Sequence, residues 1–524
     1  DFCLSRGLGD VYKRQLRPSA PGTPAEARQG PPASGTPPTM SISAPSRPSA
    51  VPSPWIAWLV AATFFMENLD ATIITTALPA MAQSFGVEPS HMSIGMSAYM
   101  LALAVGIPAS GWLADRYGPR HVFAAAIAIF TLSSVWCGLS DSLGGFTAAR
   151  VAQGLGGAMM VPVGRLVVLR GTRKADLIRA IATITWPGLA APVLGPPLGG
   201  FIATHWGWHW IFFINIPLGL IALAAAWLLI RDGASEQSRR LDIPGFVLSA
   251  IGFTALMLGM EWASHTPFEA VQVFAALAIG VGVLAWACRH LLRSTAPLVN
   301  LAPFRIQTFA VTVGGGSLFR VAIGSAPFLL PLMFQLALGL SAVDAGLLML
   351  ALFAGNLLVK PATTGILRRW GFKRVILVNG LMVAAGFAVC AAFTPQTPLP
   401  WIAVVLFISG MNRSMQFTAL NTLAFADIPP ARMSDASTLS SMFQQFNAGM
   451  GIAFGALALS LAGHALGDPG GGPAGSIVTL ATFRWALLLS AALTVLALAD
   501  ALRLPADAGG QVSGHARRRD GPAT

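Results

Sequence analysis

Two acidic residues lie inside the first long apolar stretch of this chain. Glu67 and Asp70 are three residues apart in an expected helix over residues 56–80, so their side chains share one helix face. A carboxylate at the centre of a bilayer costs roughly 2.5 to 3.5 kcal/mol on insertion scales, so it needs a compensating partner. Arg150, in an expected helix over residues 146–168, reaches a similar depth. The three residues therefore predict an intramembrane charge cluster.

This cluster has two interpretations. In the first, burial favours the neutral acid and Arg150 favours the ionised acid, so opening and closing of a cleft changes the protonation state. Each proton that enters down the gradient then supplies about 2.3 kcal/mol per 100 mV. In the second, the cluster is a permanent salt bridge that orients two helices. We expect proton coupling, with Asp70 ahead of Glu67 as the proton carrier and Arg150 as the partner.

Composition indicates the elements that must hold these residues. Of the 524 residues, 54% are apolar and only 10% are charged, against roughly 25% charged residues in soluble domains. Apolar runs of about 18 to 25 residues, long enough to cross a bilayer, recur from Trp55 almost to Leu502. We therefore predict an all-α polytopic membrane protein with about fourteen transmembrane helices. The cysteines and histidines show no convincing metal-ligand spacing, and we expect no metal and no cofactor.

The basic residues between these runs are confined to alternate connections. If the N-terminus is cytoplasmic, the even-numbered connections hold them and the odd-numbered ones hold none. The basic residues are Arg116, Arg120, Arg170, Arg173, Lys174, Arg179, Arg231, Arg239, Arg240, Arg289, Arg293, Arg305, Arg368, Arg369, Lys373, Arg374 and Arg432. The positive-inside rule then places both termini in the cytoplasm of a bacterium, with the chain in its cytoplasmic (inner) membrane. It also explains the net charge of +12 without a nucleic-acid partner.

Both ends of the chain differ from the apolar middle. Residues 1–54 are rich in Pro, Ser, Ala and Gly, which is typical of a disordered tail. Its first 39 residues precede Met40, which we expect to be the true start. Residues 504–524, with their run of arginines, are expected to form a short disordered cytoplasmic tail.

Three motifs occur twice in the chain, in the same order. The pattern L-P-x-M-x-Q occurs at Leu78–Gln83 and again at Leu330–Gln335. The pattern R-x-x-Q occurs at Arg150–Gln153 and at Arg413–Gln416, and the basic loop 116–120 matches 369–373. Six helices are therefore duplicated, in residues 55–231 and 306–503, and two helices in residues 242–292 are inserted between them. Parallel six-helix repeats of this kind bind substrate between the halves, near the bilayer midplane.

Four motifs carry a family resemblance. Gly111–Arg120 (GWLADRYGPR) resembles the loop after the second helix of the major facilitator superfamily, and Leu69–Pro79 resembles the first-helix motif of its fourteen-helix drug:proton antiporters, the QacA/EmrB type. Arg150–Ala158 (RVAQGLGGA) is similar to that family's fourth-helix motif. Gly195–Gly200 (GPPLGG) is similar to its fifth-helix antiporter motif. The resemblance covers residues 55–503.

The resemblance implies a major facilitator fold, with two six-helix halves plus two inserted helices. It implies a conformational latch on the cytoplasmic side, formed by Gly111, Asp115, Arg116, Gly118 and Arg120. In the second half Arg368 replaces the acid that would match Asp115, so no latch is expected there. The resemblance also implies that the fifth helix forms a proton-tight interface that favours exchange over symport. The residues of this antiporter motif are Pro192, Gly195, Pro196, Gly199 and Gly200.

Polar and aromatic residues of the expected spans are candidates for the substrate cleft. Arg320 and Arg413 are cations in mid-span, so each should face the cleft or a partner. Methionine and aromatic side chains could form an adaptable apolar wall, although packing or lipid contact is the better explanation for them. The cleft candidates are Gln153, Trp186, Arg320, Arg413, Gln416, Phe443 and Asn447.

Three functions are compatible with these features. The first is proton-coupled export of amphipathic drugs or toxic small molecules by a monomer that contacts lipid, protons and a small-molecule substrate. The second is dedicated export of one metabolite, such as a sugar, an amino acid or a siderophore. The third is a membrane sensor or enzyme without transport. No phosphate-binding loop, zinc-protease motif or nucleophile elbow is present in the sequence, so we do not expect an enzyme.

Overall fold

The structure is a computed structural model. It describes residues 54–171, 177–230, 241–264, 269–295, 297–429, 432–466, 479–505 and 508–509. These residues form helices and connecting turns, and no strand occurs among them. The predicted tails, apart from residues 54, 504, 505, 508 and 509, lie outside the described residues, as do Arg173, Lys174, Arg231, Arg239 and Arg240.

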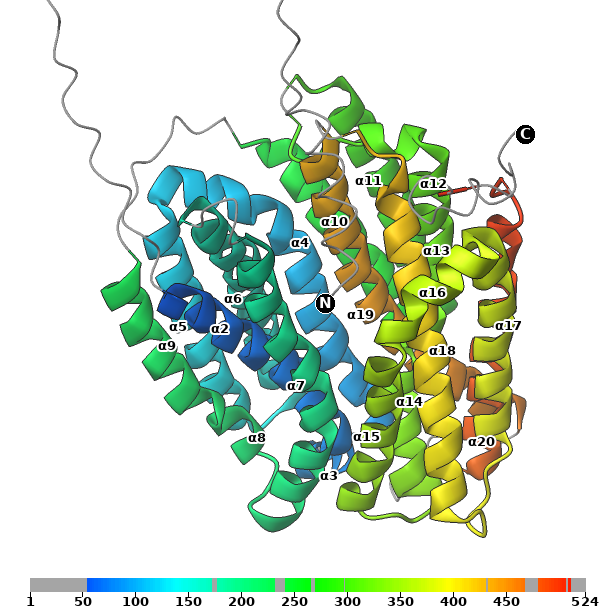
Figure 1. Ribbon diagram of the computed structural model, residues 1–524. Coiled ribbons are helices and arrows are strands. Elements are labelled where there is room, and N and C mark those ends of the chain that lie inside the picture. The colour runs from blue at the N-terminus through cyan, green and yellow to red at the C-terminus, as the bar shows by residue number, and fades with distance from the viewer. Residues whose placement is uncertain are drawn as a thin grey trace, which may run out of the picture.

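The helices follow one another with short connections, as expected for a polytopic membrane protein (Figure 1). In the first part of the chain they are α2 (Pro54–Ile73), η1 (Ile74–Thr76), α3 (Leu78–Phe85), η2 (Pro89–Met92), α4 (Ser93–Tyr117), α5 (Pro119–Gly138), α6 (Leu143–Gly171), α7 (Leu177–His205), α8 (Trp210–Phe213) and α9 (Asn215–Leu229). The middle part holds α10 (Ile243–Ala263) and α11 (Ala270–Arg293). The last part holds η4 (Ala302–Arg305), α12 (Gln307–Phe309), η5 (Ala310–Gly315), α13 (Gly316–Gly324), α14 (Ala326–Leu332), η6 (Met333–Ala337), α15 (Ala342–Leu358), α16 (Lys360–Trp370), α17 (Phe372–Ala391), α18 (Leu399–Ala426), α19 (Met433–Ala465) and α20 (Leu480–Ala501).

Most of these helices can cross a bilayer. The described residues contain eleven helices that are long and apolar enough, or twelve if α15 and α16, which meet at a bend of 51°, form one span. Helices α7 and α18, which are 29 and 28 residues long, are not among these eleven; α7 contains four prolines and α18 contains buried Arg413. With these two the total approaches the predicted fourteen. The prediction of an all-α membrane fold is confirmed.

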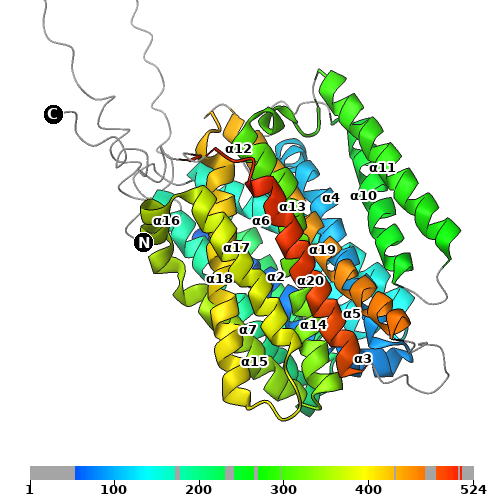
Figure 2. The same ribbon diagram turned by 90° about the vertical axis from the view of Figure 1, so that its right-hand side faces the viewer.

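The helices form two groups that lie side by side. Figure 1 shows α2 to α9, in blue to green, on the left and α13 to α20, in light green to red, on the right. Helices α10 and α11 pair with each other at one edge of the bundle, where α10 contacts α4 and α19 (Figure 2). The pair therefore bridges both groups without separating them.

One end of the bundle carries most of the described arginines, and we refer to it as the basic end. The turn between α4 and α5 lies there, next to Arg116 and Arg120, and so does the turn between α16 and α17, next to Arg368 and Lys373. Each turn contains one glycine at positive φ, Gly118 at 84° and Gly371 at 75°. Glycine adopts this conformation without steric cost. The matched turns agree with the internal repeat seen in the sequence.

At the opposite end the two groups are in direct contact. A Cβ atom on Gly346 of α15 would lie 2.5 Å from the carbonyl oxygen of Pro196 in α7, and one on Gly200 would strike the carbonyl of Ala342. The Gln335 side chain donates a hydrogen bond to the carbonyl oxygen of Thr76, 3.1 Å away. Glycines let the backbones approach this closely, and dispersion contacts then hold the helices together. The bundle is thus closed at this end.

Candidate functional site

Asp70 lies at the centre of a hydrogen-bonded network that joins four helices. Arg150 Nη1 of α6 donates to Asp70 Oδ2 over 2.6 Å, and Gln153 Nε2 and Asn215 Nδ2 each donate to Asp70 Oδ1 over 2.9 Å. Both amides also donate to Ser134 Oγ of α5. Since Asn215 begins α9, the network connects α2, α5, α6 and α9 within the first group of helices.

This network is sealed from solvent and lipid. The side chains of Asp70 and Arg150 are 0% and 1% exposed. The Arg150 guanidinium also lies 4.1 Å from the ring centroid of Tyr99, on α4, so one of its faces rests on an aromatic face. Hydrogen bonds to its remaining polar atoms stabilise a buried charge pair. Both Asp70 oxygens accept such bonds, whereas Arg150 Nε has no partner among the described residues. The predicted charge partner of Asp70 is therefore in place.

Glu67 has different surroundings from Asp70. It lines a cavity of about 430 Å³ between α2, α4, α6 and α19, whereas Asp70 is not among the residues of that lining. Its Oε2 atom is buried and has no hydrogen-bond partner among the described residues. The two acids, one helical turn apart, thus divide into a buried structural carboxylate and a carboxylate at a cavity.

The cavity lies between the two groups, in the half of the bundle nearer the basic end. Most of its α4 and α6 residues are in the later halves of those helices, which end at Tyr117 and Gly171, and its α19 residues lie in the first half of that helix, which begins at Met433. The lining residues are Phe64, Glu67, Asn68, Leu103, Ile107, Pro108, Ser110, Gly111, Gly157, Val161, Pro162, Arg165, Ser437, Thr438, Ser441, Gln444 and Gln445. Nine of the seventeen are polar or charged. A partly open space of this size suits a small-molecule ligand.

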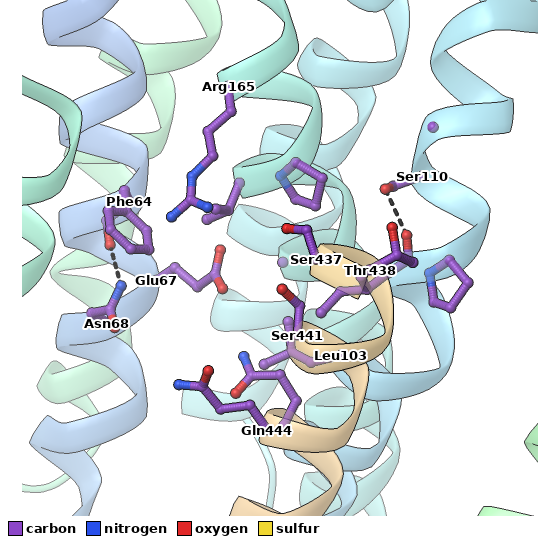
Figure 3. A pocket seen from close by; sticks show the side chains of 17 residues that line it. Phe64, Glu67, Asn68, Leu103, Ser110, Arg165, Ser437, Thr438, Ser441 and Gln444 are labelled. Atoms are coloured by element: carbon purple, nitrogen blue, oxygen red, sulfur yellow. Dashed lines mark hydrogen bonds between the residues drawn. The ribbon is translucent and has the colours of Figure 1, made fainter. Parts of the chain in front are cut away.

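The sequence analysis missed Arg165 and the whole polar face of α19. Ser437, Ser441 and Gln444 recur at spacings of four and three, which places them on one helix face. This helical spacing of polar residues in an otherwise apolar span is visible in the sequence and could have predicted the polar face. Arg165 is exposed to the cavity, and Figure 3 shows its side chain extending toward Glu67.

Several predicted cleft residues lie elsewhere. Trp186 is 53% exposed and does not line the cavity. Phe443 contacts Phe304 and Phe253, the latter on inserted helix α10, with ring centroids 5.6 and 6.4 Å apart. It lies on α19 among the cavity residues in sequence, but on another face of the helix. The Asn447 amide donates to Ser317 Oγ over 2.8 Å. Phe443 and Asn447 thus make contacts between helices in this conformation, and Trp186 lies away from the cavity.

The second group repeats the arginine and the glutamine of the network but lacks its acid. When the repeats are aligned so that Leu78 matches Leu330, Ala322 occupies the position that corresponds to Asp70. Arg413 donates instead to the carbonyl oxygen of the next residue, Ile323, over 3.1 Å. Gln416, which matches Gln153, accepts a hydrogen bond from the Asn379 amide at 3.0 Å. The two halves are therefore electrically unequal.

Arg320 likewise faces neutral partners. Its Nη1 and Nη2 atoms donate to the Thr312 carbonyl oxygen over 2.6 Å and to Asn421 Oδ1 over 3.0 Å. Thr312 lies in the π-helical turn η5, where the wider helix leaves a carbonyl available to a side chain. Arg320 and Arg413, both predicted as cleft residues, thus each donate to neutral partners, and neither is among the residues that line the cavity.

The motif glycines of α7 lie against α2. A Cβ atom on Gly195 or Gly199 would collide with Thr72 or with the Ile73 carbonyl, and the Thr76 hydroxyl donates to the Pro196 carbonyl oxygen over 3.1 Å. Pro192 lies in the same helix, among four prolines that interrupt its backbone hydrogen bonds. This helix therefore contacts both α2 and, through Gly200, the other group.

Two residues of the predicted latch have clear positions. Gly111 lines the cavity, and Arg120 donates to the Trp227 carbonyl oxygen over 3.0 Å while its guanidinium lies 4.6 Å from the Trp227 ring. Trp227 is on α9, in the same group of helices. Arg120 of this motif thus connects α5 to α9 within the first group of helices.

The protein family follows from the whole chain. Residues 60–453 match the family model described as Major Facilitator Superfamily. The chain belongs to this superfamily, which confirms the family resemblance of its motifs. It is 39% identical over 407 residues to the multidrug resistance protein MdtD of Pectobacterium carotovorum, covering 78% of this chain and 87% of that protein. It is 37% identical over 470 residues to MdtD of Escherichia coli O45:K1, covering 89% of this chain and 98% of that protein.

Solved transporters share the fold. An auto-inhibited POT family peptide transporter matches 86% of this chain and 97% of its own, with a TM-score of 0.64 and 15% identity. A bacterial homologue of the lysosomal transporter Spinster matches 91% of this chain and 100% of its own, with a TM-score of 0.59 and 17% identity. These proteins have the architecture of a transporter, and the chain is not expected to be an enzyme.

Proposed function

We propose that this protein is a proton-coupled efflux transporter of the bacterial inner membrane, which exports small molecules and exchanges them for protons. Its relatives of 37% and 39% identity are named for multidrug resistance. The observation that carries the proposal is the carboxylate of Glu67 at the wall of a small-molecule cavity between the two halves. A proton site and a substrate site at one place allow each ligand to affect the other.

The basic end faces the cytoplasm in this proposal. Arginine and lysine remain on the cytoplasmic side during membrane insertion, and Arg116, Arg120, Arg368 and Lys373 all lie at that end. The cavity then faces the cytoplasm, and the contact of Gly346 with Pro196 closes the outer side. This conformation is the one that would receive substrate from the cell interior.

Glu67 is the proton carrier, and the Asp70 network transmits its state. Asp70 is held by Arg150, Gln153 and Asn215 together, so its protonation would break several hydrogen bonds at once. Glu67 has no such set of donors. This order reverses the one expected from the sequence, where Asp70 came first.

Reconstitution into liposomes tests the proposal. Purified protein is placed in liposomes with a pH gradient. Proton flux and probe movement are recorded for a small panel of fluorescent compounds that includes a cationic dye and a zwitterion. We expect coupled flux in the wild type and in Cys288→Ser, an exposed residue of α11 that is remote from the cavity. Glu67→Gln should bind dye but lose the proton flux that the dye elicits. Unaltered coupling in Glu67→Gln would overturn the assignment of Glu67, and absence of coupled flux in the wild type would overturn proton-coupled efflux.

A dedicated metabolite exporter is the second candidate. The polar lining from α19 supports it, because Ser437, Thr438 and Ser441 offer hydrogen bonds that an unspecific apolar pocket would lack. A single transported compound among many tested would favour this candidate.

A further inference from the structure

The cavity contains a guanidinium and a carboxyl group that form no ion pair with each other among the described residues. Arg165 extends toward Glu67 from the side of the basic end (Figure 3). The Arg165 guanidinium lies 5.6 Å from the centroid of the Phe64 ring. Glu67 Oε2 has no hydrogen-bond partner among the described residues. The cavity thus presents one guanidinium and one carboxyl group to whatever occupies it.

The wall beside these groups is polar. Ser437, Thr438, Ser441, Gln444 and Gln445 of α19 all line the cavity, and Figure 3 shows Ser441 and Gln444 beside and below Glu67. Hydroxyls and amides both donate and accept hydrogen bonds, so they can solvate either charge of a ligand. The only aromatic residue of the lining is Phe64. Such a lining does not resemble the apolar, aromatic surface that would suit a lipophilic cation.

We infer that the transported compounds are zwitterionic small molecules, whose anionic group binds Arg165 and whose ammonium group binds Glu67. This inference rests on the proposed function. A guanidinium binds a carboxylate through charge-assisted hydrogen bonds, which are roughly twice as strong as neutral ones. A ligand with both charges satisfies both groups, whereas a ligand with a single positive charge leaves Arg165 unpaired beside it.

The same arrangement couples substrate binding to the protonation of Glu67. Glu67 binds the ammonium group only as a carboxylate, so a proton and the substrate compete for it. Loading from the cytoplasm requires an ionised Glu67, and a proton that arrives from the outside displaces the ammonium group. Arg165 keeps its charge throughout, and it therefore contributes specificity without titrating.

A matched set of probes tests the inference. Nε-dansyl-lysine is zwitterionic, its methyl ester is a cation, and its Nα-acetyl derivative is an anion, while the fluorophore is the same in all three. Binding to the detergent-purified full chain is followed by dansyl fluorescence. We expect the zwitterion to bind about tenfold or more tightly than either derivative, as one charge-assisted hydrogen bond of about 1.5 kcal/mol or more predicts. Equal affinities for the zwitterion and the methyl ester, or binding of none of the probes, would overturn the inference.

Two substitutions test which residue binds which charged group of the ligand. Arg165→Gln should weaken binding of the zwitterion to the level of the methyl ester, and Arg165→Lys should restore part of the difference. Glu67→Gln should instead make the zwitterion equal to the acetyl derivative. Cys288→Ser and the thermal unfolding temperature of each variant control for misfolding. If Arg165→Gln leaves the preference for the zwitterion intact, the assignment of Arg165 is wrong.

A flux measurement separates this inference from the proposed function. Proton-coupled movement of the methyl ester in liposomes, without a preference for the zwitterion, would leave the efflux function standing and overturn the substrate class. Absence of proton-coupled movement of every probe and of the cationic dye would overturn both.

Discussion

Arg150 Nη1 and Asp70 Oδ2 are 2.6 Å apart, and their side chains are almost completely buried. This pair joins the first span of the chain to the helix that carries the repeated R-x-x-Q motif. Because Gln153 and Asn215 also bind Asp70, the pair fixes the relative positions of α2, α6 and α9. Both carboxylate oxygens of Asp70 accept hydrogen bonds within the first half.

Removal of either partner should destabilise the protein. Asp70→Ala leaves the Arg150 guanidinium buried without its carboxylate, and breaking a buried pair in this way costs about 3 to 5 kcal/mol. We expect a lower thermal unfolding temperature in detergent for Asp70→Ala and for Arg150→Ala. The double variant should lose less than the sum of the single losses, since neither charge then remains unpaired. Additive losses would contradict the pairing.

Substitutions at Gly346 should open the closed end. A valine there would push its side chain into the Pro196 carbonyl, so the two halves could no longer meet as they do in this structure. We expect Gly346→Val to shift the population away from the state that is open at the basic end. Spin labels placed across the opposite end should report a longer distance. Gly282→Val, where a Cβ atom meets nothing within 4 Å, is the matched control and should leave that distance unchanged.

The inserted pair of helices should depend on a buried acid. Ser93 Oγ of α4 donates to Glu261 Oε1 of α10 over 2.7 Å, and Glu261 is 0% exposed. Glu261→Leu should leave the Ser93 hydroxyl unsatisfied and weaken the contact of α10 with α4, at a cost of about 1 to 3 kcal/mol. Hydrogen exchange should rise in residues 243–263 more than elsewhere in the chain. A uniform rise, or none, would show that α10 does not depend on this contact.

The other end of the inserted pair should weaken in acid. Burial of the Asp242 carboxyl opposes its ionisation, but hydrogen bonds from His290, Gly245 and Leu298 outweigh that effect and lower the pKa of Asp242 below its ordinary 3.8. A lowered native pKa means that the stabilisation is complete above pH 3.8 and is lost as the pH falls through the native value. The unfolding temperature of Asp242→Asn should therefore lie below that of the wild type near neutral pH. This difference in unfolding temperature should narrow only in strong acid. A difference that disappears near pH 6 would show that another titrating group is responsible.

The sequence by itself determined the bilayer environment, the helical class and the duplicated motifs. Hydropathy and the confinement of Lys and Arg to alternate connections are properties of segments, and partition between water and lipid acts on each segment separately. The same holds for the turn glycines Gly118 and Gly371, whose positive φ is a local requirement. The pairing of Asp70 with Arg150 could also be predicted, because each buried charge needs a partner and few candidates existed at that depth.

Only the tertiary structure decided which side chains share the cavity. Glu67 and Asp70 are one turn apart, yet one lines the cavity and the other is enclosed by α5, α6 and α9, because the rotation of α2 depends on its neighbours. Arg165 and Ser441 are far apart in sequence and meet only when α6 and α19 pack at the same level. Phe443 faces α10 for the same reason. Hydropathy records how apolar a helix is, but the face that a helix turns toward a cavity depends on the packing of the whole bundle.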